Sequence, residues 1–226
     1  MGFFNSPSIV TDGLVLYVDA ANAKSYPGSG TTWFDISGNA YNATLTNSPT
    51  WSNANSGRFA FNGSNQSATT AAPNITISTF TIICWIFSAA NQNSFTGICQ
   101  HRSSGNAWGL GCSYGTPVTN QLGYTWAADS ATYSWNSGLI IPNNQWSMVA
   151  LSTSTTSASL YLNSSFASQN HTNSSFTLGA LTIAHDTIVS TRFFNGNIAL
   201  TSFYNRALTV GEIGQNFNAL RGRFGV

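Results

Sequence analysis

The stretch FTIICWIFS, residues 80–88, is apolar on both of its alternating sides. In an extended chain every second side chain points to the same face of a sheet. One set here comprises Phe80, Ile82, Cys84 and Ile86, and the other comprises Ile83, Trp85 and Phe87. A strand of this kind is covered on both faces, so the stretch predicts a central strand in a layered β-protein.

Similar short apolar runs recur along the chain and are separated by Gly, Pro, Asn and Ser, which is typical of strands joined by tight turns. The predicted strands are 14–20, 58–62, 80–88, 97–102, 107–114, 122–127, 146–152, 158–163, 181–185 and 197–204. In 107–114 the large residues share one face, namely Trp108, Leu110, Cys112 and Tyr114. The small opposite face predicts close approach of a second layer, a ligand or a neighbouring subunit. The pattern as a whole predicts an all-β sandwich.

One helix is predicted near the C-terminus. Thr209 stands as its N-cap, and Glu212, three residues later, completes a capping box. Val210, Ile213, Phe217 and Leu220 then fall on one stripe at helical spacing. Helix capping therefore accounts for the single glutamate of the chain.

The composition predicts a folded domain with a weak electrostatic field. Of 226 residues, 42% are hydrophobic, whereas seven basic and six acidic residues leave a formal charge of +1. Binding to nucleic acid or to an anionic membrane surface needs clustered Lys and Arg, which this chain lacks. The longest apolar run is far too short to cross a bilayer. Cys84, Cys99 and Cys112 are predicted as buried apolar residues on strands rather than as a disulfide framework.

The titratable residues give no sign of catalysis. Hydrolysis of glycosides generally uses two carboxylates on either side of the scissile bond, and no two acids of this chain are close in sequence. A pair assembled by folding stays open. His185 and Asp186 are adjacent but lack the spacing of a zinc site, and His101 with Arg102 is interpreted as a polar strand end. The chain is therefore expected not to be an enzyme.

The segment WFDISGN, residues 33–39, contains one of the few carboxylates, Asp35. Asp35 and Asn39 could contribute oxygens to a calcium site on a loop. The same segment is also a good turn, in which Asp35 binds its own backbone and Gly38 adopts a positive φ. Both interpretations stay open.

The region 108–135 is rich in aromatic residues. Aromatic faces beside amides and hydroxyls suit a sugar, because the rings stack on apolar sugar faces. Strict alternation in the strands equally suits the core, so loop residues are the better candidates for exposure. The candidate glycan-binding residues are Trp126, Asp129, Tyr133, Trp135 and Asn136.

Several ordered segments together resemble a known family. They include GLVLYVDAANAKSYPGSGTTWFDISGN at 13–39, FAFNGSNQ at 59–66 and FNGNIALTSFYNRALTVGEIGQNF at 194–217. The chain resembles laminin-G-like, concanavalin A-like jelly-roll domains of the kind found in structural proteins of tailed bacteriophages, marine ones in particular. The resemblance implies a two-sheet antiparallel jelly roll that binds glycans or protein surfaces, with a calcium ion near one edge.

Family members carry an aspartate at the position of Asp35 and often one at the position of Asp19. The resemblance therefore implies Asp19, Asp35 and Asn39 as calcium ligands. The E-x-D-x-E-like catalytic strand of the glycosidase branch is missing here.

These observations predict an N-terminal arm, residues 1–12, followed by one jelly-roll domain, residues 13–226. The expected function is that of a non-enzymatic virion surface protein, on the capsid or the tail, that adheres to host glycans. Its expected partners are other virion proteins, host surface polysaccharide and further copies of the chain on the particle. Two alternatives stay open: a purely structural capsid-stabilising protein without glycan binding, and a polysaccharide depolymerase.

Overall fold

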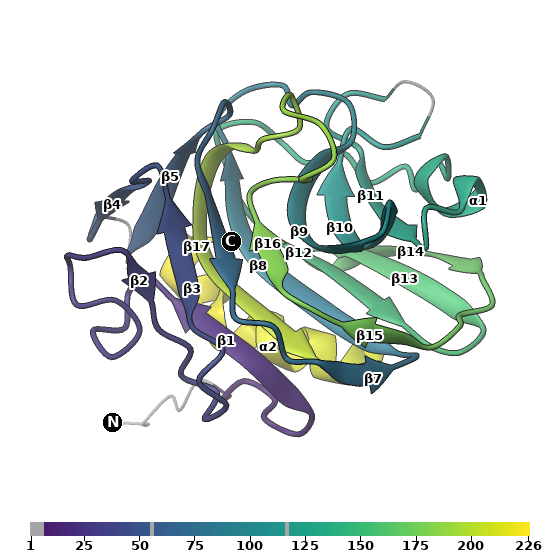
Figure 1. The fold of residues 1–226 in the computed structure, drawn as a ribbon, viewed down its shortest axis with the longest axis horizontal. Helices are drawn as coiled ribbons and strands as arrows, with labels where there is room; N and C mark the ends of the chain where they lie inside the picture. Colours follow the sequence, from purple (N-terminus) through teal and green to yellow (C-terminus); the bar gives the residue numbers. More distant parts are fainter. Residues whose placement is uncertain (1–6, 55–56, 116–117) are drawn as a thin grey trace.

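The computed structural model describes residues 7–54, 57–115 and 118–226, so residues 1–6 of the predicted arm lie outside the described part. Two antiparallel sheets pack against each other and enclose the main core (Figure 1). This confirms the predicted all-β sandwich. No helix among the described residues is both long enough and apolar enough to span a membrane.

The eight-stranded sheet forms one layer. In spatial order its path is β14 (Ser165–Asn170), β13 (Ser157–Leu162), β12 (Trp146–Thr153), β8 (Phe80–Ser88), β17 (Asn195–Tyr204), β5 (Arg58–Asn62) and β4 (Thr50–Ser52). β1 (Leu14–Asp19) also pairs with β17. All of these pairings are antiparallel.

The seven-stranded sheet forms the other layer. Its order is β11 (Leu122–Trp126), β10 (Asn106–Cys112), β9 (Thr96–Ser103), β16 (Leu181–Ile183), β6 (Ser67–Thr70), β3 (Ala43–Thr46) and β2 (Thr32–Trp33). A separate two-stranded sheet joins β15 (Phe176–Leu178) to β7 (Ile75–Ile77). In the seven-stranded sheet, strands that are distant in sequence become neighbours, and β16 lies between β9 and β6.

β8 lies between β12 and β17, and it has the two covered faces that its sequence predicts. Phe80, Ile82, Cys84 and Ile86 belong to the core between the sheets. The alternate residues Ile83 and Trp85 belong to a second core on the outer side of the same sheet. The strand is therefore the shared wall of two hydrophobic layers.

The seven-stranded sheet is apolar on one face and polar on the other. Directly paired residues point to the same face. Its inner row is Tyr124, Leu110, Cys99, Ile183, Ala68 and Leu45, all of which belong to the main core. Its outer row is Thr125, Gly109, Gln100, Thr182, Thr69, Thr44 and Thr32. The outer face thus presents hydroxyl and amide groups where the inner face presents hydrocarbon.

Helix α2 (Val210–Phe224) covers the outer face of the eight-stranded sheet (Figure 1). The predicted capping box is confirmed, because Thr209 and Glu212 each bond to the other's backbone N–H. The Trp85 ring stacks on Phe217 and Phe224, with centroid distances of 5.9 and 4.2 Å. A rear layer of aromatic rings therefore joins helix to sheet.

Residues 7–12 run beside α2 rather than joining a sheet. The Val10 N–H donates to Oδ1 of Asn216 at 2.8 Å, and the Tyr204 hydroxyl donates to the Val10 carbonyl at 2.9 Å. Both ends of the described chain are thereby attached to the same rear face.

Tyr114 occupies the opposite face from the one predicted. Ser113 has φ of 57°, which ends the extended run at Cys112 and turns the next side chain over. The Tyr114 ring therefore lies on the outer face, where a Cβ at Gly111 or Gly123 would come within 2.5 or 2.1 Å of its atoms. The small face predicted to admit a close neighbour is covered by a side chain of the same molecule.

The core contains polar atoms without partners. Three free cysteines are buried, as the sequence predicts. Within the described part of the chain, the indole N–H groups of Trp33, Trp85, Trp108 and Trp126 make no hydrogen bond. Each of these rings is packed among hydrophobic side chains of the two cores.

Candidate functional site

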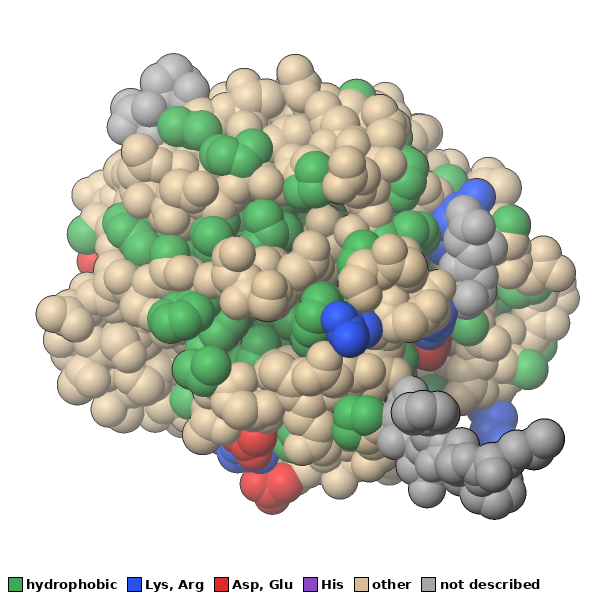
Figure 2. All heavy atoms as spheres, turned by 180° about the vertical axis from the view of Figure 1, so that it is seen from behind, with side chains coloured by type: hydrophobic (Ala, Val, Ile, Leu, Met, Phe, Trp, Pro, Cys, Tyr) green, Lys and Arg blue, Asp and Glu red, His purple; other side chains and the backbone are tan. Residues whose placement is uncertain are grey.

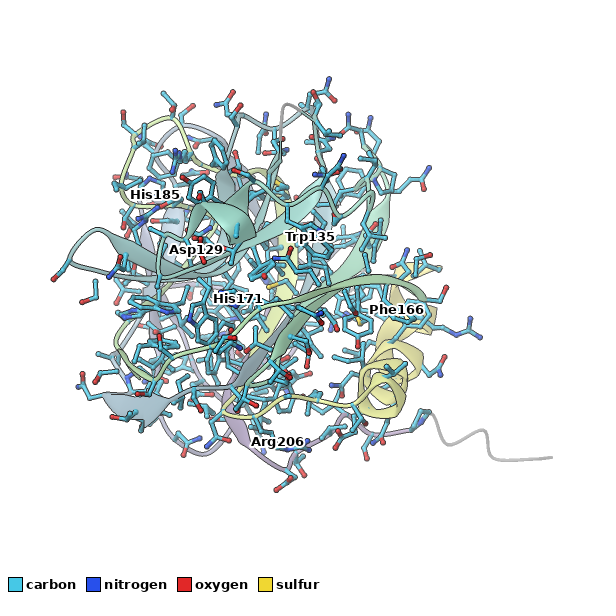
Figure 3. All side chains as sticks on the ribbon, turned by 90° about the vertical axis from the view of Figure 1, so that its right-hand side faces the viewer. Asp129, Trp135, Phe166, His171, His185 and Arg206 are labelled. Atoms are coloured by element: carbon cyan, nitrogen blue, oxygen red, sulfur yellow. The ribbon has the colours of Figure 1, made fainter. Side chains whose placement is uncertain are left out.

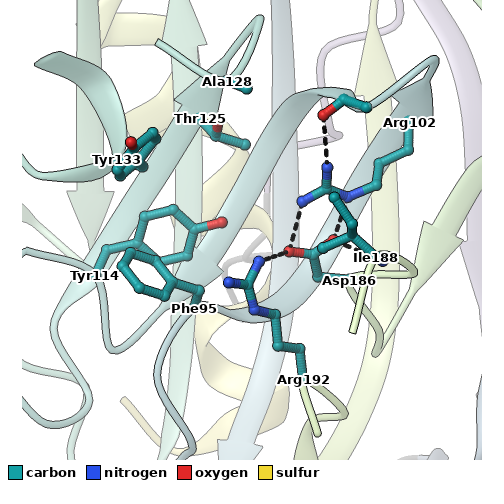
Figure 4. Close-up of a pocket in the computed structure, with 10 residues that line it drawn as sticks. Phe95, Arg102, Tyr114, Thr125, Ala128, Tyr133, Asp186, Ile188 and Arg192 are labelled. Atoms are coloured by element: carbon teal, nitrogen blue, oxygen red, sulfur yellow. Dashed lines mark hydrogen bonds and ion pairs between the residues drawn. The ribbon is translucent and has the colours of Figure 1, made fainter. Parts of the chain in front are cut away.

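A pocket of about 340 Å³ opens on the outer face of the seven-stranded sheet, at the end formed by β9, β10 and β11 (Figure 4). Loops after β8, β10 and β16 surround it, together with helix α1 (Ser130–Tyr133). Its lining residues are Phe95, Arg102, Gly105, Tyr114, Thr125, Ala128, Tyr133, Asp186, Ile188 and Arg192.

Glycines leave room for the floor of this pocket. Gly109 has φ of 148°, and a Cβ there would lie 2.4 Å from the Cys99 carbonyl oxygen. Tyr114 rests on Gly111 and Gly123, and its hydroxyl accepts a hydrogen bond from Nε2 of Gln100 at 2.7 Å. Burial raises the pKa of Tyr114, so the hydroxyl stays protonated at neutral pH. The floor is a flat aromatic ring whose polar end is fixed.

Aromatic rings form one wall. Phe95 makes edge contacts with Tyr114 and Tyr133, at centroid distances of 5.2 and 5.9 Å. The Arg192 guanidinium carbon lies 5.0 Å from the centre of the Phe95 ring. This is the distance range of a cation–π contact.

Three charged residues form the opposite wall. Asp186 is fully buried, and its carboxylate accepts from both Nε and Nη2 of Arg102 and from Nη1 of Arg192 (Figure 4). Burial alone would raise the pKa of Asp186, but the hydrogen bonds and charges of the two arginines outweigh it and lower the pKa. Asp186 is therefore ionised at neutral pH and holds both guanidinium groups in place.

Several non-glycine residues around the pocket have positive φ. Phe95, Ser113, Ala127 and Ala128 all have positive φ, between 51° and 60°, although none is glycine. Each such residue costs on the order of 1 kcal/mol and persists only where its surroundings hold it. Nine further non-glycine residues of the described chain also have positive φ, so this conformation is not confined to the pocket.

Of the predicted glycan-binding residues, Tyr133 lines the pocket. Trp126 lies in the core at 2% exposure, where its ring stacks on Phe80 with a centroid distance of 5.5 Å. Its place follows from β11, in which Trp126 shares the inner face with Tyr124.

The other three candidates lie outside the pocket lining, and Figure 3 shows Asp129 and Trp135 near α1. Asp129 is exposed and caps α1 by accepting from the Ala131 N–H at 2.9 Å. Trp135 is half-buried against the core, and Asn136 is exposed. Their role in glycan binding stays a prediction.

The predicted calcium ligands already have partners. Oδ1 of Asp35 accepts from the N–H groups of Tyr17 and Ser37, and Oδ2 accepts from the Ser37 hydroxyl and the Tyr41 N–H, all at 2.8 to 2.9 Å. Asp35 thus anchors the turn and ties it to β1. These bonds occupy the oxygens that a cation would need, so this arrangement does not fit a calcium site.

Asp19 and Asn39 do not complete a calcium shell with Asp35. Asp19 accepts from Nη1 of Arg223 at 2.8 Å, and the side-chain amide of Asn39 donates to backbone carbonyls of β1. Among the described ranges, no three His, Cys, Asp or Glu side chains converge as metal ligands. Calcium binding stays a prediction and is tested below.

Sequence reasoning missed most of the pocket. Arg102 and Asp186 are 84 residues apart, and only the pairing of β9 with β16 brings them together. The adjacent His185 and Asp186 suggested a metal pair, whereas the partners of Asp186 are Arg102 and a second arginine six residues later. The signal that could have found the pocket is the rarity of charged residues. With only six acids in the chain, each one is a candidate for a specific structural or functional role.

A second and larger hollow, about 590 Å³, lies at the rear between α2 and the β13–β14 hairpin. Figure 2 shows hydrophobic side chains gathered in hollows on this rear face. Arg221 is the one charged residue in its lining as described. Ligand sites combine apolar walls with a few converging polar groups, and the front pocket has that combination.

The chain resembles known proteins in sequence and in fold. The model of the Concanavalin A-like lectin/glucanases superfamily matches residues 62–214. No curated protein sequence matches the chain.

Three solved structures illustrate the likeness in fold. Domain 4 of AbnA, an extracellular arabinanase of Geobacillus stearothermophilus, in complex with arabinotriose, has a TM-score of 0.70 at 15% identity, over 90% of this chain and 97% of that one. The binding domain of botulinum neurotoxin serotype D has 0.67 at 13%, over 92% and 52%. Trypanosoma rangeli sialidase with the inhibitor DANA has 0.65 at 15%, over 93% and 33%.

Proposed function

We propose, from the premise that the chain belongs to the Concanavalin A-like lectin/glucanases superfamily, that it binds carbohydrate in the front pocket. The observation that carries this proposal is the meeting of aromatic rings and fixed polar groups on one open face. Phe95 and Tyr133 are half-buried and offer their rings to the apolar faces of sugar rings, while the buried Tyr114 ring supports Phe95 from within. Thr125 and the two arginines offer hydrogen-bonding groups to sugar hydroxyls.

The single carboxylate in the described lining of the pocket favours binding over catalysis. Asp186 is the one acid in its described lining, and both of its oxygens accept from arginine. A glycosidase of the usual kind needs a second carboxylate and a free proton donor. We therefore infer a binding domain rather than a depolymerase.

Two of the structural neighbours add support of a general kind. The arabinanase domain is described in complex with arabinotriose, and the neurotoxin domain is described as a binding domain. Those statements concern those proteins. Their bearing on this chain is that the same fold serves binding elsewhere.

A place on a bacteriophage particle, as a capsid or tail surface protein, is a narrower proposal that rests on the sequence resemblance. The arabinanase, sialidase and neurotoxin matches lend it no support. A structural role without glycan binding remains its alternative. Mass spectrometry of purified virions tests it, since the proposal requires the protein to be present in stoichiometric amounts.

The carbohydrate proposal is tested by binding to a panel of immobilised polysaccharides, with soluble oligosaccharide as competitor. Tyr133→Ser removes a ring from the pocket wall and should weaken binding about threefold to tenfold, the range expected for loss of one aromatic contact. Phe166→Ser is the matched control, because it removes a 55% exposed aromatic residue from the rear hollow. Equal effects of the two variants, or no saturable binding to any polysaccharide, would overturn the proposal.

A further inference from the structure

We propose that the front pocket selects acidic sugars and that Arg192 binds the carboxylate of a uronic acid unit. The inference rests on the proposed carbohydrate function and deepens it by naming the class of sugar. It follows from the charge balance of the pocket and from the hydrogen bonds that its two arginines make.

The pocket carries a surplus of positive charge. Arg102 and Arg192 face a single ionised acid, Asp186, so the described lining has a net charge of +1. The other five acids of the chain lie outside that lining: Asp12, Asp19, Asp35, Asp129 and Glu212. One arginine would have been enough to neutralise a buried carboxylate. The second is left in excess.

The two arginines differ in how much hydrogen bonding they have left. Arg102 gives Nε and Nη2 to Asp186 and donates from Nη1 to the Gly105 carbonyl at 3.1 Å. Arg192 donates to Asp186 from Nη1 alone, at 2.8 Å. Its Nε and Nη2 have no acceptor among the described residues. These two groups form one side of the guanidinium plane, and that whole side remains available.

The available side of Arg192 suits a carboxylate. Two parallel N–H donors match the two oxygens of a carboxylate in a planar, bidentate pair, which a single hydroxyl cannot do. Figure 4 shows the guanidinium between Asp186 and the rings of Phe95 and Tyr114. A sugar lying against the half-buried Phe95 ring would therefore bring its acidic substituent to Arg192.

Asp186 acts as a positioning residue in this scheme. It is fully buried and fixes the orientation of the Arg192 plane through Nη1. The Arg192 side chain is 24% exposed, so it is partly desolvated yet reachable. Partial desolvation strengthens an ion pair relative to one in open water.

The test compares acidic oligosaccharides with their methyl esters, which have the same sugar rings without the charge. Trimers of galacturonate, glucuronate-containing hyaluronan and alginate are titrated into the full-length protein by calorimetry, each as the free acid and as the ester. We expect the preferred free acid to bind at least about tenfold more tightly than its ester. Raising the salt concentration from about 50 mM to about 500 mM should weaken binding of the acid and leave the ester unchanged.

Variants assign the preference to one residue. Arg192→Gln should abolish the difference between acid and ester, because a neutral amide cannot form the bidentate ion pair. The ester should also bind more weakly, but by a smaller factor than the acid, since Arg192 offers hydrogen bonds to hydroxyls as well. Arg102 still pairs with Asp186 in this variant. Arg192→Lys keeps the charge without the bidentate geometry, and should retain part of the preference. Arg221→Gln, which removes the same charge from the rear hollow, is the control. Thermal melting shows whether each variant is folded.

The outcomes separate this inference from the function beneath it. Acid and ester binding equally well, or an unchanged preference in Arg192→Gln, would overturn the acidic-sugar proposal and leave carbohydrate binding standing. Failure of every acid, ester and neutral polysaccharide to bind would overturn both.

Discussion

The two outer faces of the sandwich differ in polarity and in what covers them. The eight-stranded sheet is covered by α2, and stacked rings of Trp85, Phe217 and Phe224 fill the space between them. On the outer face of the seven-stranded sheet the short helix α1 lies only beside the front pocket. The rest of that face, in the described chain, carries a row of threonines and a glutamine. The rear face contributes buried hydrocarbon, and the front face contributes a polar surface. The rear hydrophobic layer and the proposed ligand site thus lie on different faces of one small domain.

The separation has a physical basis in burial. A strand covered on both faces buries apolar surface on each of them, and each Å² buried stabilises the fold by about 25 cal/mol. A strand covered on one face leaves the other free for groups that bind ligands. Substitutions in the rear hydrophobic layer should therefore leave ligand binding at the front unaffected.

The largest effect is expected at the rear. Phe224→Ala removes a ring that is 7% exposed and that contacts both Trp85 and Trp146. Truncation of a buried phenylalanine should lower the free energy of unfolding by about 3–5 kcal/mol, as measured by urea denaturation. Affinity for the preferred oligosaccharide, measured well below the transition, should be unchanged. A weakened affinity would show that the two faces are coupled.

Asp186→Asn, in the front pocket, should lower the free energy of unfolding by nearly as much. The neutral amide has one acceptor oxygen in place of two and carries no charge, so the two guanidinium groups lose hydrogen bonds and their counter-charge. We expect a loss of about 3 kcal/mol in unfolding free energy, as for breaking a buried ion pair, together with weakened sugar binding. Asp129→Asn is the matched control, because Asn caps a helix as well as Asp. Stability unchanged in Asp186→Asn would mean that the arginines need no counter-charge.

Asp35→Asn tests a carboxylate held by the backbone instead of by arginine. Its amide nitrogen would have to replace one of two oxygens that each accept two hydrogen bonds. We expect about 2 kcal/mol of destabilisation in urea denaturation, since at least one buried donor loses its acceptor. A change below about 0.5 kcal/mol would show that the turn tolerates an amide.

The same residue decides the calcium prediction. A ligand present at 100 times its Kd adds about 2.7 kcal/mol to stability, which would be a clear rise in Tm. Because the oxygens of Asp35 are taken by N–H and O–H donors, we expect the same Tm in calcium and in chelator. A higher Tm in calcium that disappears in Asp35→Asn would establish the site and show that the loop rearranges.

A smaller effect is expected at the start of α2. Thr209→Ala removes the side chain that accepts from the Glu212 N–H, which should cost about 1 kcal/mol in urea denaturation. Thr209→Ser keeps the hydroxyl and should lie within a few tenths of the wild-type value. Sugar binding should be the same in both variants, because the helix lies on the rear face.

The smallest effect is expected in how stability falls as the pH is lowered. A hydrogen bond from Arg206, followed by one from the Thr209 backbone, lowers the pKa of Glu212 from 4.5 to about 2. A depressed folded-state pKa stabilises the fold above the ordinary pKa, and that contribution is lost as the pH falls from about 4.5 towards 2. Glu212→Gln should flatten the pH dependence in that window, as measured by Tm against pH. An unchanged slope would assign the loss of stability at low pH to other carboxylates.

The sequence predicts the covered strands well and the polar ones poorly. β8 and β12 are apolar enough to identify directly, as is the amphipathic α2 with its capping box. The strands that pattern reading missed are β2, β3, β4, β6, β7, β14 and β15. They are two to six residues long, and β6 and β14 consist mainly of small polar residues, so their pairing partners define them rather than their own alternation.

The front pocket could not be read from the sequence for a related reason. Tyr114 lies on the open face because one residue, Ser113, has a positive φ, and Ser gives no local sign of that conformation. Arg102 and Asp186 meet because β16 inserts between β9 and β6, which is a property of the topology. Tyr133 was predicted because aromatic residues in a loop are visible without knowledge of pairing.

The four unpaired indole N–H groups make local opening of the protein observable by hydrogen exchange. Their protons, on Trp33, Trp85, Trp108 and Trp126, have no acceptor in the described structure and no path to water while the layers stay closed. Each should therefore appear as a resolved, slowly exchanging signal in a proton NMR spectrum. Trp85 reports on the rear layer, and the other three report on the space between the sheets. Their exchange rates would show whether the helix detaches before the sandwich opens or only together with it.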